Sequence, residues 1–254
     1  MQHCSTPLRP RSARKNWLPP MAGLLLSLVI SSPAHAAFEA CRALFPHHHV
    51  PAVPAGRFGK TRDLCFDDFA VLYSPTSRTP VYGVERLNKH ALLDHQKRTN
   101  RFYEEARLRP GERSSLADYR ATLGIQHFDR GHIVPAGDRS TEAGMAQSFS
   151  LANMTPQYPS FNRRTWAGVE RATRKYVMRA KGDVYVFTGP YYGSHPQKLG
   201  PDQVWIPDYV YKLVYDPTTG RSWAFWLPNL QQVRMQPPIS YQELVRRTGI
   251  HFLD

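Results

Sequence analysis

The chain has 254 residues, of which 41% are hydrophobic and 21% are charged, as in an ordinary globular protein. Lysine and arginine outnumber aspartate and glutamate by 33 to 20. The resulting formal net charge of +13 favours a polyanionic partner such as nucleic acid, anionic lipid or polysaccharide. The length leaves room for one large domain or two small ones, and we favour one because no long linker or internal repeat divides the chain.

Residues 1–36 have the pattern of a secretory signal peptide. A basic region without acidic residues, 9–15, precedes a short apolar core at 21–32, and Ala34-His35-Ala36 fits the small-x-small cleavage rule. The alternative is a membrane anchor, which needs about 20 apolar residues, and this run is too short. We therefore expect cleavage after Ala36 and a periplasmic or secreted mature protein that is not bound to a membrane.

The cysteines fit the same interpretation. Cys41 and Cys65 would remain after cleavage, and an even pair in an oxidising compartment predicts a disulfide, with two buried free thiols as the alternative. A cysteine-based zinc site is not expected, because the sequence has no CxxC pair. The disulfide would fasten residues 37–64, a proline-rich arm that we expect to be irregular. Three adjacent histidines in this arm, His47–His49, are not expected to converge on one metal ion.

Residues 65–254 are expected to form the single domain. Apolar and aromatic runs bounded by turn residues predict five strands, at 66–73, 79–87, 184–188, 210–215 and 222–227. Gly189-Pro190 is expected to end the third of these strands, and 198–208 is expected to be a loop.

Helical patterns are fewer. An apolar stripe of Trp166, Val169, Ala172, Tyr176, Val177 and Ala180 predicts a helix from Arg164 to Gly182. Shorter segments are predicted as a helix start at 87–96, a short helix or loop at 141–152 and a capped helix at 240–245. Strands and helices without strict β–α–β alternation indicate an α+β fold.

The most informative segment is Asp129-Arg130-Gly131-His132, within a predicted strand that turns at Gly131. Hydrolysis of a phosphodiester needs a base for the attacking water, and an imidazole is efficient because its pKa lies near neutrality. We expect His132 to be that base, Gly131 to allow a tight backbone turn, Asp129 to fix the ring or the turn, and Arg130 to pair with Asp129. A lone histidine in a strand is more often a buried structural residue, but the residues around this one favour catalysis.

Asn162 and Glu170 suggest a metal site. The neutral amide oxygen of Asn162 suits a hard ion such as magnesium, which keeps most of its waters. Glu170 lies eight residues later, about 12 Å along a regular helix, so we expect it to orient water rather than to share the first coordination shell. The alternatives are a helix cap at Asn162 and a surface ion pair between Glu170 and Arg174.

Arginines surround these residues in the sequence. Guanidinium groups form forked hydrogen bonds with phosphate oxygens and stay charged at working pH, which favours a phosphate-binding role for one or two of them. The candidates are Arg98, Arg101, Arg163, Arg164, Arg171 and Arg174. Because phosphates carry no base information, recognition through them predicts weak sequence preference.

Together these motifs resemble the DNA/RNA non-specific endonucleases of the ββα-metal group, the endonuclease G-like nucleases. The resemblance extends from about residue 65 to 252. It is carried by the segments 129–138, 153–157, 161–170, 186–190, 206–207 and 211–212. It implies a central antiparallel sheet flanked by helices, with the histidine strand and the asparagine helix forming the ββα-metal element.

The resemblance also implies catalytic roles. His132 would be the general base, and Asn153 would support either His132 or the scissile phosphate. Asn162 would be the sole direct protein ligand of a hydrated magnesium ion, with manganese as an alternative metal, and Glu170 would act through metal-bound water. A catalytic arginine is expected upstream of the histidine; Arg98 and Arg101 both qualify, and we prefer Arg101.

Asp129, Arg130, Arg98 and Arg174 are the expected substrate-binding residues. The function that results is an exported, magnesium-dependent endonuclease acting on DNA and RNA without regard to the sugar. The alternative is a non-catalytic secreted protein that binds nucleic acid or another polyanion. A toxin-like nuclease with a cognate inhibitor and a homodimer both stay open, as does the preference between DNA and RNA.

Overall fold

The computed structural model describes residues 1–3, 38–94 and 96–254. The expected signal peptide therefore lies, except for its first three residues, outside the described residues. Residues His35–Asp254 form one compact unit. Within the described ranges, no helix is both long and apolar enough to cross a membrane.

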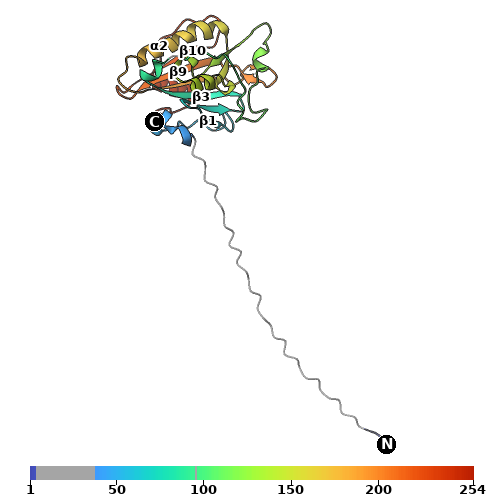
Figure 1. Cartoon of the computed structure of the whole chain (residues 1–254). Helices are drawn as coiled ribbons and strands as arrows, with labels where there is room; N and C mark the ends of the chain where they lie inside the picture. Colours follow the sequence, from blue (N-terminus) through green and yellow to red (C-terminus); the bar gives the residue numbers. More distant parts are fainter. Residues whose placement is uncertain (4–37, 95) are drawn as a thin grey trace. The chain divides into compact units, whose positions relative to one another are not determined.

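A six-stranded antiparallel sheet lies at the centre of this unit (Figure 1). In spatial order its strands are β1 (Arg62–Cys65), β2 (Phe69–Ser74), β3 (Thr79–Leu87), β6 (Val184–Tyr191), β9 (Tyr209–Asp216) and β10 (Arg221–Pro228). The expected α+β fold with a central antiparallel sheet is confirmed.

In the described residues, three α-helices and two two-stranded antiparallel sheets complete the main elements. The helices are α1 (Glu142–Ser148), α2 (Ala167–Val177) and α3 (Tyr241–Thr248), and the small sheets pair β4 (Asp129–His132) with β5 (Met154–Gln157) and β7 (Lys198–Leu199) with β8 (Val204–Trp205). A π-helical segment, η7 (Phe161–Trp166), leads directly into α2. Short 3-10 turns are η1 (Glu39–Leu44), η2 (Pro46–His48), η3 (His90–Leu92), η4 (Asp118–Arg120), η5 (Ala136–Asp138) and η6 (Leu151–Asn153).

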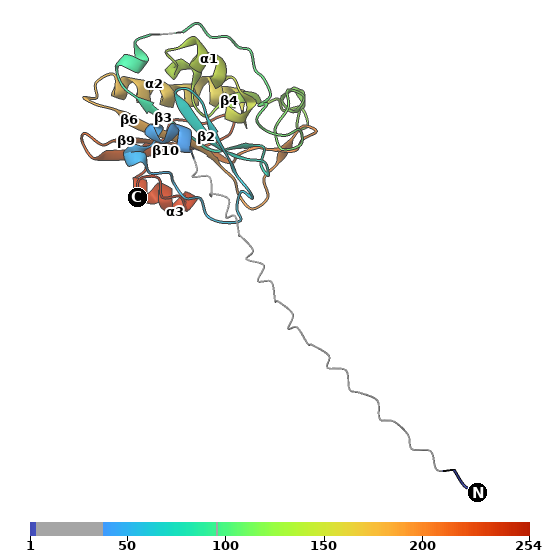
Figure 2. The ribbon, with the colours of Figure 1, turned by 60° about the horizontal axis from the view of Figure 1, so that its bottom comes forward.

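The two faces of the sheet carry separate hydrophobic clusters. Figure 2 shows α1, α2 and β4 on one side of the sheet and α3 with the C-terminus on the other. On the α2 side, Trp166 and Val169 pack with strand residues such as Val210, whereas on the α3 side Leu244 and Phe252 belong to the larger cluster. Alternation along each strand sends successive side chains to these opposite faces.

Helix α2 is amphipathic, but its buried row differs slightly from the prediction. Val169, Thr173 and Val177 are buried, whereas Ala172 is exposed. Thr173 is tolerated in the core because its hydroxyl donates a hydrogen bond of 3.0 Å to the carbonyl of Val169, one turn earlier. The helix therefore presents the face opposite this row to solvent.

Other predicted elements changed in length. The helix expected at 87–96 reduces to the three-residue turn η3, and the loop at 198–208 contains the β7–β8 hairpin. Strand β6 continues through Pro190 because its pairing with β3 stops at Thr188, so Pro190 pairs only with β9. A proline, which has no N–H to donate, is tolerated in a strand where one side of the strand is unpaired.

A disulfide joins Cys41 to Cys65, with a Cα–Cα distance of 5.8 Å, which confirms the expected pairing and rejects the free thiols. It fastens the arm to strand β1. The arm is short of regular structure, as expected, but Phe38, Phe45 and Phe58 are buried in the same cluster as the sheet.

Candidate active site

The two-stranded sheet of β4 and β5 carries His132. In this sheet Gly131 pairs with Thr155 and His132 pairs with Met154. Gly131 does not form the turn that we expected: it lies within β4 and its φ is not positive. It is required by close packing instead, since a Cβ at this position would lie 2.2 Å from the side chain of Gln157.

His132 lies in an enclosed, aromatic environment. It is 7% exposed, and its ring lies 5.0 Å from that of Phe149, edge to face, and 5.9 Å from that of Phe102. Burial, reinforced by nearby arginines, lowers the pKa of His132 to about 3, so the ring is neutral at working pH. Its Nε2 is buried without a hydrogen-bond partner in the described part of the chain.

Asn153 fixes the backbone that follows His132. Its side-chain oxygen accepts a hydrogen bond of 2.9 Å from the N–H of Val134, and its amide nitrogen donates to the carbonyls of Val134 and Ser148, each at 2.9 Å. The residue is fully buried. Its side chain is therefore engaged with the backbone, which favours support of His132 over contact with a phosphate.

Asp129 orients Asn162. The amide nitrogen of Asn162 donates to Asp129 at 2.9 Å, and Arg163 forms a forked pair with the same carboxylate at 2.8 and 2.6 Å. The expected pair of Arg130 with Asp129 is therefore wrong, because Asp129 pairs with Arg163 instead. With its nitrogen held in this way, the oxygen of Asn162 accepts no hydrogen bond within the described ranges.

Glu170 lies on α2, whereas Asn162 lies on the preceding π-helical segment η7. Glu170 is half-buried, and burial raises the pKa of its carboxyl to about 7, against the opposing positive charge of Lys212. The alternative of a surface pair with Arg174 does not hold, because Arg174 donates to the buried Asp138 at 2.8 Å instead.

Sequence reasoning missed a buried ionic layer behind the site. Lys212 is fully buried and donates to the hydroxyl of Thr188 at 2.7 Å. Arg139 is buried as well and bonds both Glu85 and Asp68. The available signal was a lysine inside an almost wholly apolar strand, where a charged side chain needs a specific partner.

The upstream arginines differ in where their side chains lie. Arg98 lies over the ring of Phe149, 5.1 Å from its centroid, and lines the same cavity as His132. Arg101 is exposed and is not among the residues that line that cavity. The geometry therefore favours Arg98 over our preferred Arg101. Arg130 also lines the cavity and stacks 4.1 Å above the ring of Phe102.

One cavity of about 330 Å³ brings most of these residues together. Its lining consists of Arg98, Arg130, His132, Pro135, Ala136, Gly137, Asn162, Arg163, Ala167 and Glu170. The imidazole, the carboxamide and the carboxylate that are separated in the sequence thus face one space, together with three guanidinium groups.

The residues present fit a hydrated hard ion. Across the described residues, no three histidine, cysteine, aspartate or glutamate side chains converge into a metal site. The unengaged amide oxygen of Asn162, at the wall of the cavity, is the type of ligand that magnesium accepts while it keeps its waters. Glu170 lines the same cavity and is placed to accept hydrogen bonds from such waters.

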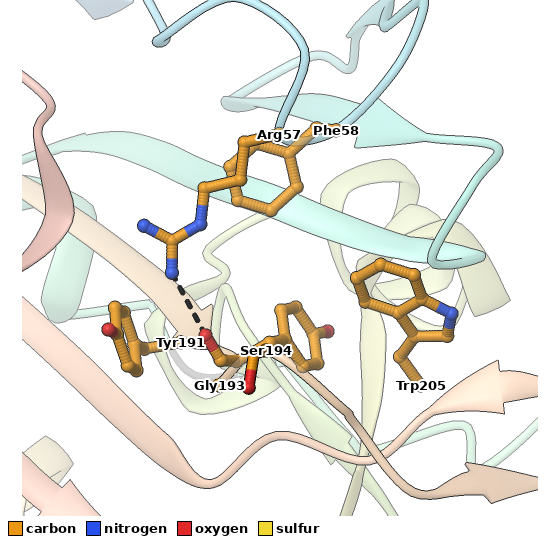
Figure 3. Close-up of a pocket in the computed structure, with 7 residues that line it drawn as sticks. Arg57, Phe58, Tyr191, Gly193, Ser194 and Trp205 are labelled. Atoms are coloured by element: carbon orange, nitrogen blue, oxygen red, sulfur yellow. Dashed lines mark hydrogen bonds between the residues drawn. The ribbon is translucent and has the colours of Figure 1, made fainter.

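A second cavity, of about 370 Å³, is drawn in Figure 3. Arg57 crosses it, donating at 2.9 Å to the carbonyl of Tyr192 and stacking 4.6 Å from the ring centroid of Tyr191. Trp205 forms the opposite wall. None of the expected site residues lines this cavity, so it is separate from the catalytic one.

Comparison with known proteins identifies the family. The family model described as DNA/RNA non-specific endonuclease matches residues 51–254. The chain belongs to this family. The resemblance inferred from the sequence motifs is confirmed.

Individual nucleases of the family are similar over long stretches. Nuclease C1 of Cunninghamella echinulata var. echinulata is 31% identical over 223 residues, covering 77% of this chain and 84% of that protein. Human mitochondrial endonuclease G is 29% identical over 160 residues, covering 58% and 52%. Mitochondrial nuclease 1 of Schizosaccharomyces pombe is 31% identical over 183 residues, covering 62% and 54%. The chain therefore spans about half the length of these two mitochondrial relatives.

A solved structure supports the same fold. A crystal structure of the EndoG/EndoGI complex superposes with a TM-score of 0.68 at 24% identity, covering 78% of this chain and 87% of that one. At this identity the match establishes the fold and no more.

The expected periplasmic or secreted location is contradicted by the comparisons. Endonuclease G, nuclease 1 and the zebrafish nuclease EXOG are all named as mitochondrial. The reason for the error is compositional: a basic leader without acidic residues is also the pattern of a mitochondrial transit segment. The charge pattern of residues 1–36 therefore does not distinguish the two destinations.

Proposed function

We propose that this nuclease hydrolyses phosphodiester bonds within DNA and RNA chains, with His132 as the general base and one hydrated divalent ion, magnesium or manganese. The observation that carries the proposal is the single cavity lined by His132, Asn162 and Glu170 together with arginines. A binding protein has no need of this set.

In the proposed mechanism each residue has a separate task. Arg98 and Arg130 hold the oxygens of the scissile phosphate through charge-assisted hydrogen bonds. His132 is neutral and accepts a proton from the attacking water. Because a bound phosphate brings negative charge next to the ring, it raises the low pKa of His132 towards the useful range.

The remaining residues serve the metal position. The ion, held by the Asn162 oxygen, would supply positive charge to stabilise the phosphoryl and leaving oxygens. Asp129 keeps the Asn162 amide turned so that its oxygen is available. Glu170 orients water, and Asn153 holds the backbone beside His132 in place.

The direct test uses purified protein with supercoiled plasmid and, separately, with RNA. Magnesium should support cleavage of both substrates, and EDTA should stop it. Both substrates left intact by folded protein in the presence of magnesium or manganese would contradict the proposal.

A second test replaces the base. His132→Ala should lose roughly 10²- to 10⁴-fold in cleavage rate while it still binds DNA, because the phosphate-binding arginines remain. The matched control is His195→Ala, since His195 is exposed and does not line the catalytic cavity. Full activity of His132→Ala would remove His132 from the mechanism.

A further inference from the structure

A groove outside the catalytic cavity runs between η3 and α2. It has a volume of about 660 Å³ and is lined by Leu92, Leu93, Arg171, Arg174, Lys175, Met178 and Arg179. Leu93 and Met178 are 52% and 36% exposed, and both rank among the exposed large hydrophobic residues of the described chain. The groove therefore combines two surfaces. Its apolar floor consists of Leu92, Leu93 and Met178, and its basic wall consists of Arg171, Arg174, Lys175 and Arg179.

The basic wall carries unpaired charge. Arg171, Lys175 and Arg179 are exposed, and in the described part of the chain none of them forms an ion pair. Among the residues that the structure describes, no carboxylate lines the groove. The four-residue spacing places the three side chains in one row along the helix and its last turn. The row spans roughly 12 Å.

Arg174 joins this groove to the catalytic cavity. It lines the groove, and its guanidinium donates to Asp138 at 2.8 Å. A Cβ at Gly137, which lines the catalytic cavity, would lie 3.2 Å from the same guanidinium. Arg174, which lines the groove, thus lies beside Gly137, which lines the cavity.

We propose that the groove binds the single polynucleotide strand that continues from the scissile phosphate, an inference that rests on the proposed nuclease function. The row of Arg171, Lys175 and Arg179 pairs with phosphates along the strand, since its span of roughly 12 Å covers about three to four nucleotides at the rise of about 3.4 Å per nucleotide of a stacked strand. Leu93 and Met178 contact base faces, which a single strand exposes and a duplex keeps stacked.

The test compares two triple variants that lose the same charge. Arg171→Gln/Lys175→Gln/Arg179→Gln removes the row. Lys60→Gln/Arg109→Gln/Lys198→Gln removes three exposed charges that do not line the groove. The affinity of each protein for a single-stranded oligonucleotide is measured in EDTA, which prevents cleavage, over a series of salt concentrations.

The first variant should bind more weakly, and the slope of log affinity against log salt should be shallower by about 2, because each phosphate contact on a single strand contributes about 0.7. The control should keep nearly the wild-type slope. Equal slopes for the two variants would overturn the proposal, as would equal losses on single-stranded and duplex oligonucleotides.

The contribution of the apolar floor to binding is measured with a separate variant. Leu93→Gln/Met178→Gln should weaken single-strand binding several-fold without a change in salt slope, because no charge is altered. Unchanged affinity in this variant would remove the floor from the proposal. A change of oligomeric mass in sedimentation, with oligonucleotide affinity unchanged, would assign the groove to a second copy of the chain and overturn the proposal.

Cleavage assays separate failure of this inference from failure of the proposed function. On a substrate with a single phosphodiester bond, the row variant should match the wild type, whereas on a long strand its KM should rise with kcat unchanged. Wild-type protein that cleaves neither substrate would refute the proposed function. Wild-type cleavage with no difference between the row variant and the control would refute the groove alone.

Discussion

At the scale of single residues, Arg98 and Arg101 lie close together in the sequence but differ in where their side chains lie. Of these two arginines, Arg98 lines the proposed catalytic cavity and Arg101 does not. Arg98→Ala should lower kcat/KM for plasmid cleavage about 10²-fold or more, the usual cost of a lost charge-stabilising donor. Arg101→Ala should stay within about threefold of the wild type, as exposed charges contribute little. The opposite ranking in the same assay would return the catalytic role to Arg101.

His132 also makes a prediction about stability and pH. Its pKa is about 3 in the folded protein and close to 6.5 when unfolded, so between these values the unfolded chain binds the extra proton. Stability should therefore be lost as the pH falls through this window, by about 2 kcal/mol from pH 7 to pH 5 for this group.

The measurement is urea unfolding of the wild type and of His132→Gln at both pH values. The variant should lose less stability than the wild type between pH 7 and pH 5, because glutamine does not titrate. The comparison cancels carboxyl groups such as Glu170, whose raised pKa acts in the opposite direction. Identical pH dependence of the two proteins would mean that His132 is not desolvated in solution.

At the scale of elements, Asn153 connects two segments. It bonds the backbone of Val134, beyond β4, and of Ser148, at the end of α1. Asn153→Ala leaves three buried backbone groups without partners, so we expect a loss of at least about 2 kcal/mol in the free energy of unfolding. The control is Asn88→Ala, which removes two hydrogen bonds from a half-buried side chain and should cost about 1 kcal/mol or less. Equal losses in urea titrations would contradict the special role of Asn153.

Some elements could be predicted from the local sequence, whereas others depend on distant residues. Helix α3 follows its local signals closely: Ser240 caps the N–H of Glu243 at 3.1 Å, and Gly249 ends the helix with a φ of 72°. By contrast, the role of Gly131 depends on Gln157, and the passage of β6 through Pro190 depends on where β3 stops. Both are long-range facts that a local pattern does not contain.

At the scale of the whole molecule, the Cys41–Cys65 disulfide closes a loop with a sequence separation of 24. In the chain-entropy account a loop of this length stabilises the folded state by about 3.5 kcal/mol. Cys41→Ser/Cys65→Ser should lower stability by roughly that amount, measured by urea unfolding. The wild type in reductant should move towards the variant.

The nuclease activity of the Cys41→Ser/Cys65→Ser variant tests whether the disulfide affects the active site. The arm packs in the cluster on the α3 side, whereas the proposed catalytic residues lie with α2 and β4. Plasmid cleavage at low temperature should therefore be little changed in the double serine variant. A large loss of activity in a variant that is still folded would show that the arm acts on the catalytic side of the sheet.

The sequence by itself predicted the family, the α+β class and the Cys41–Cys65 disulfide, and it singled out His132, Asn162 and Glu170, which line one cavity. Each rests on residue types at fixed spacing or on local hydrophobic period. Only the tertiary structure decided that Arg98 rather than Arg101 lines the cavity, that Asp129 pairs with Arg163, and that Lys212 is buried behind Glu170. These depend on where side chains from distant segments meet, and chain spacing alone does not fix such meetings.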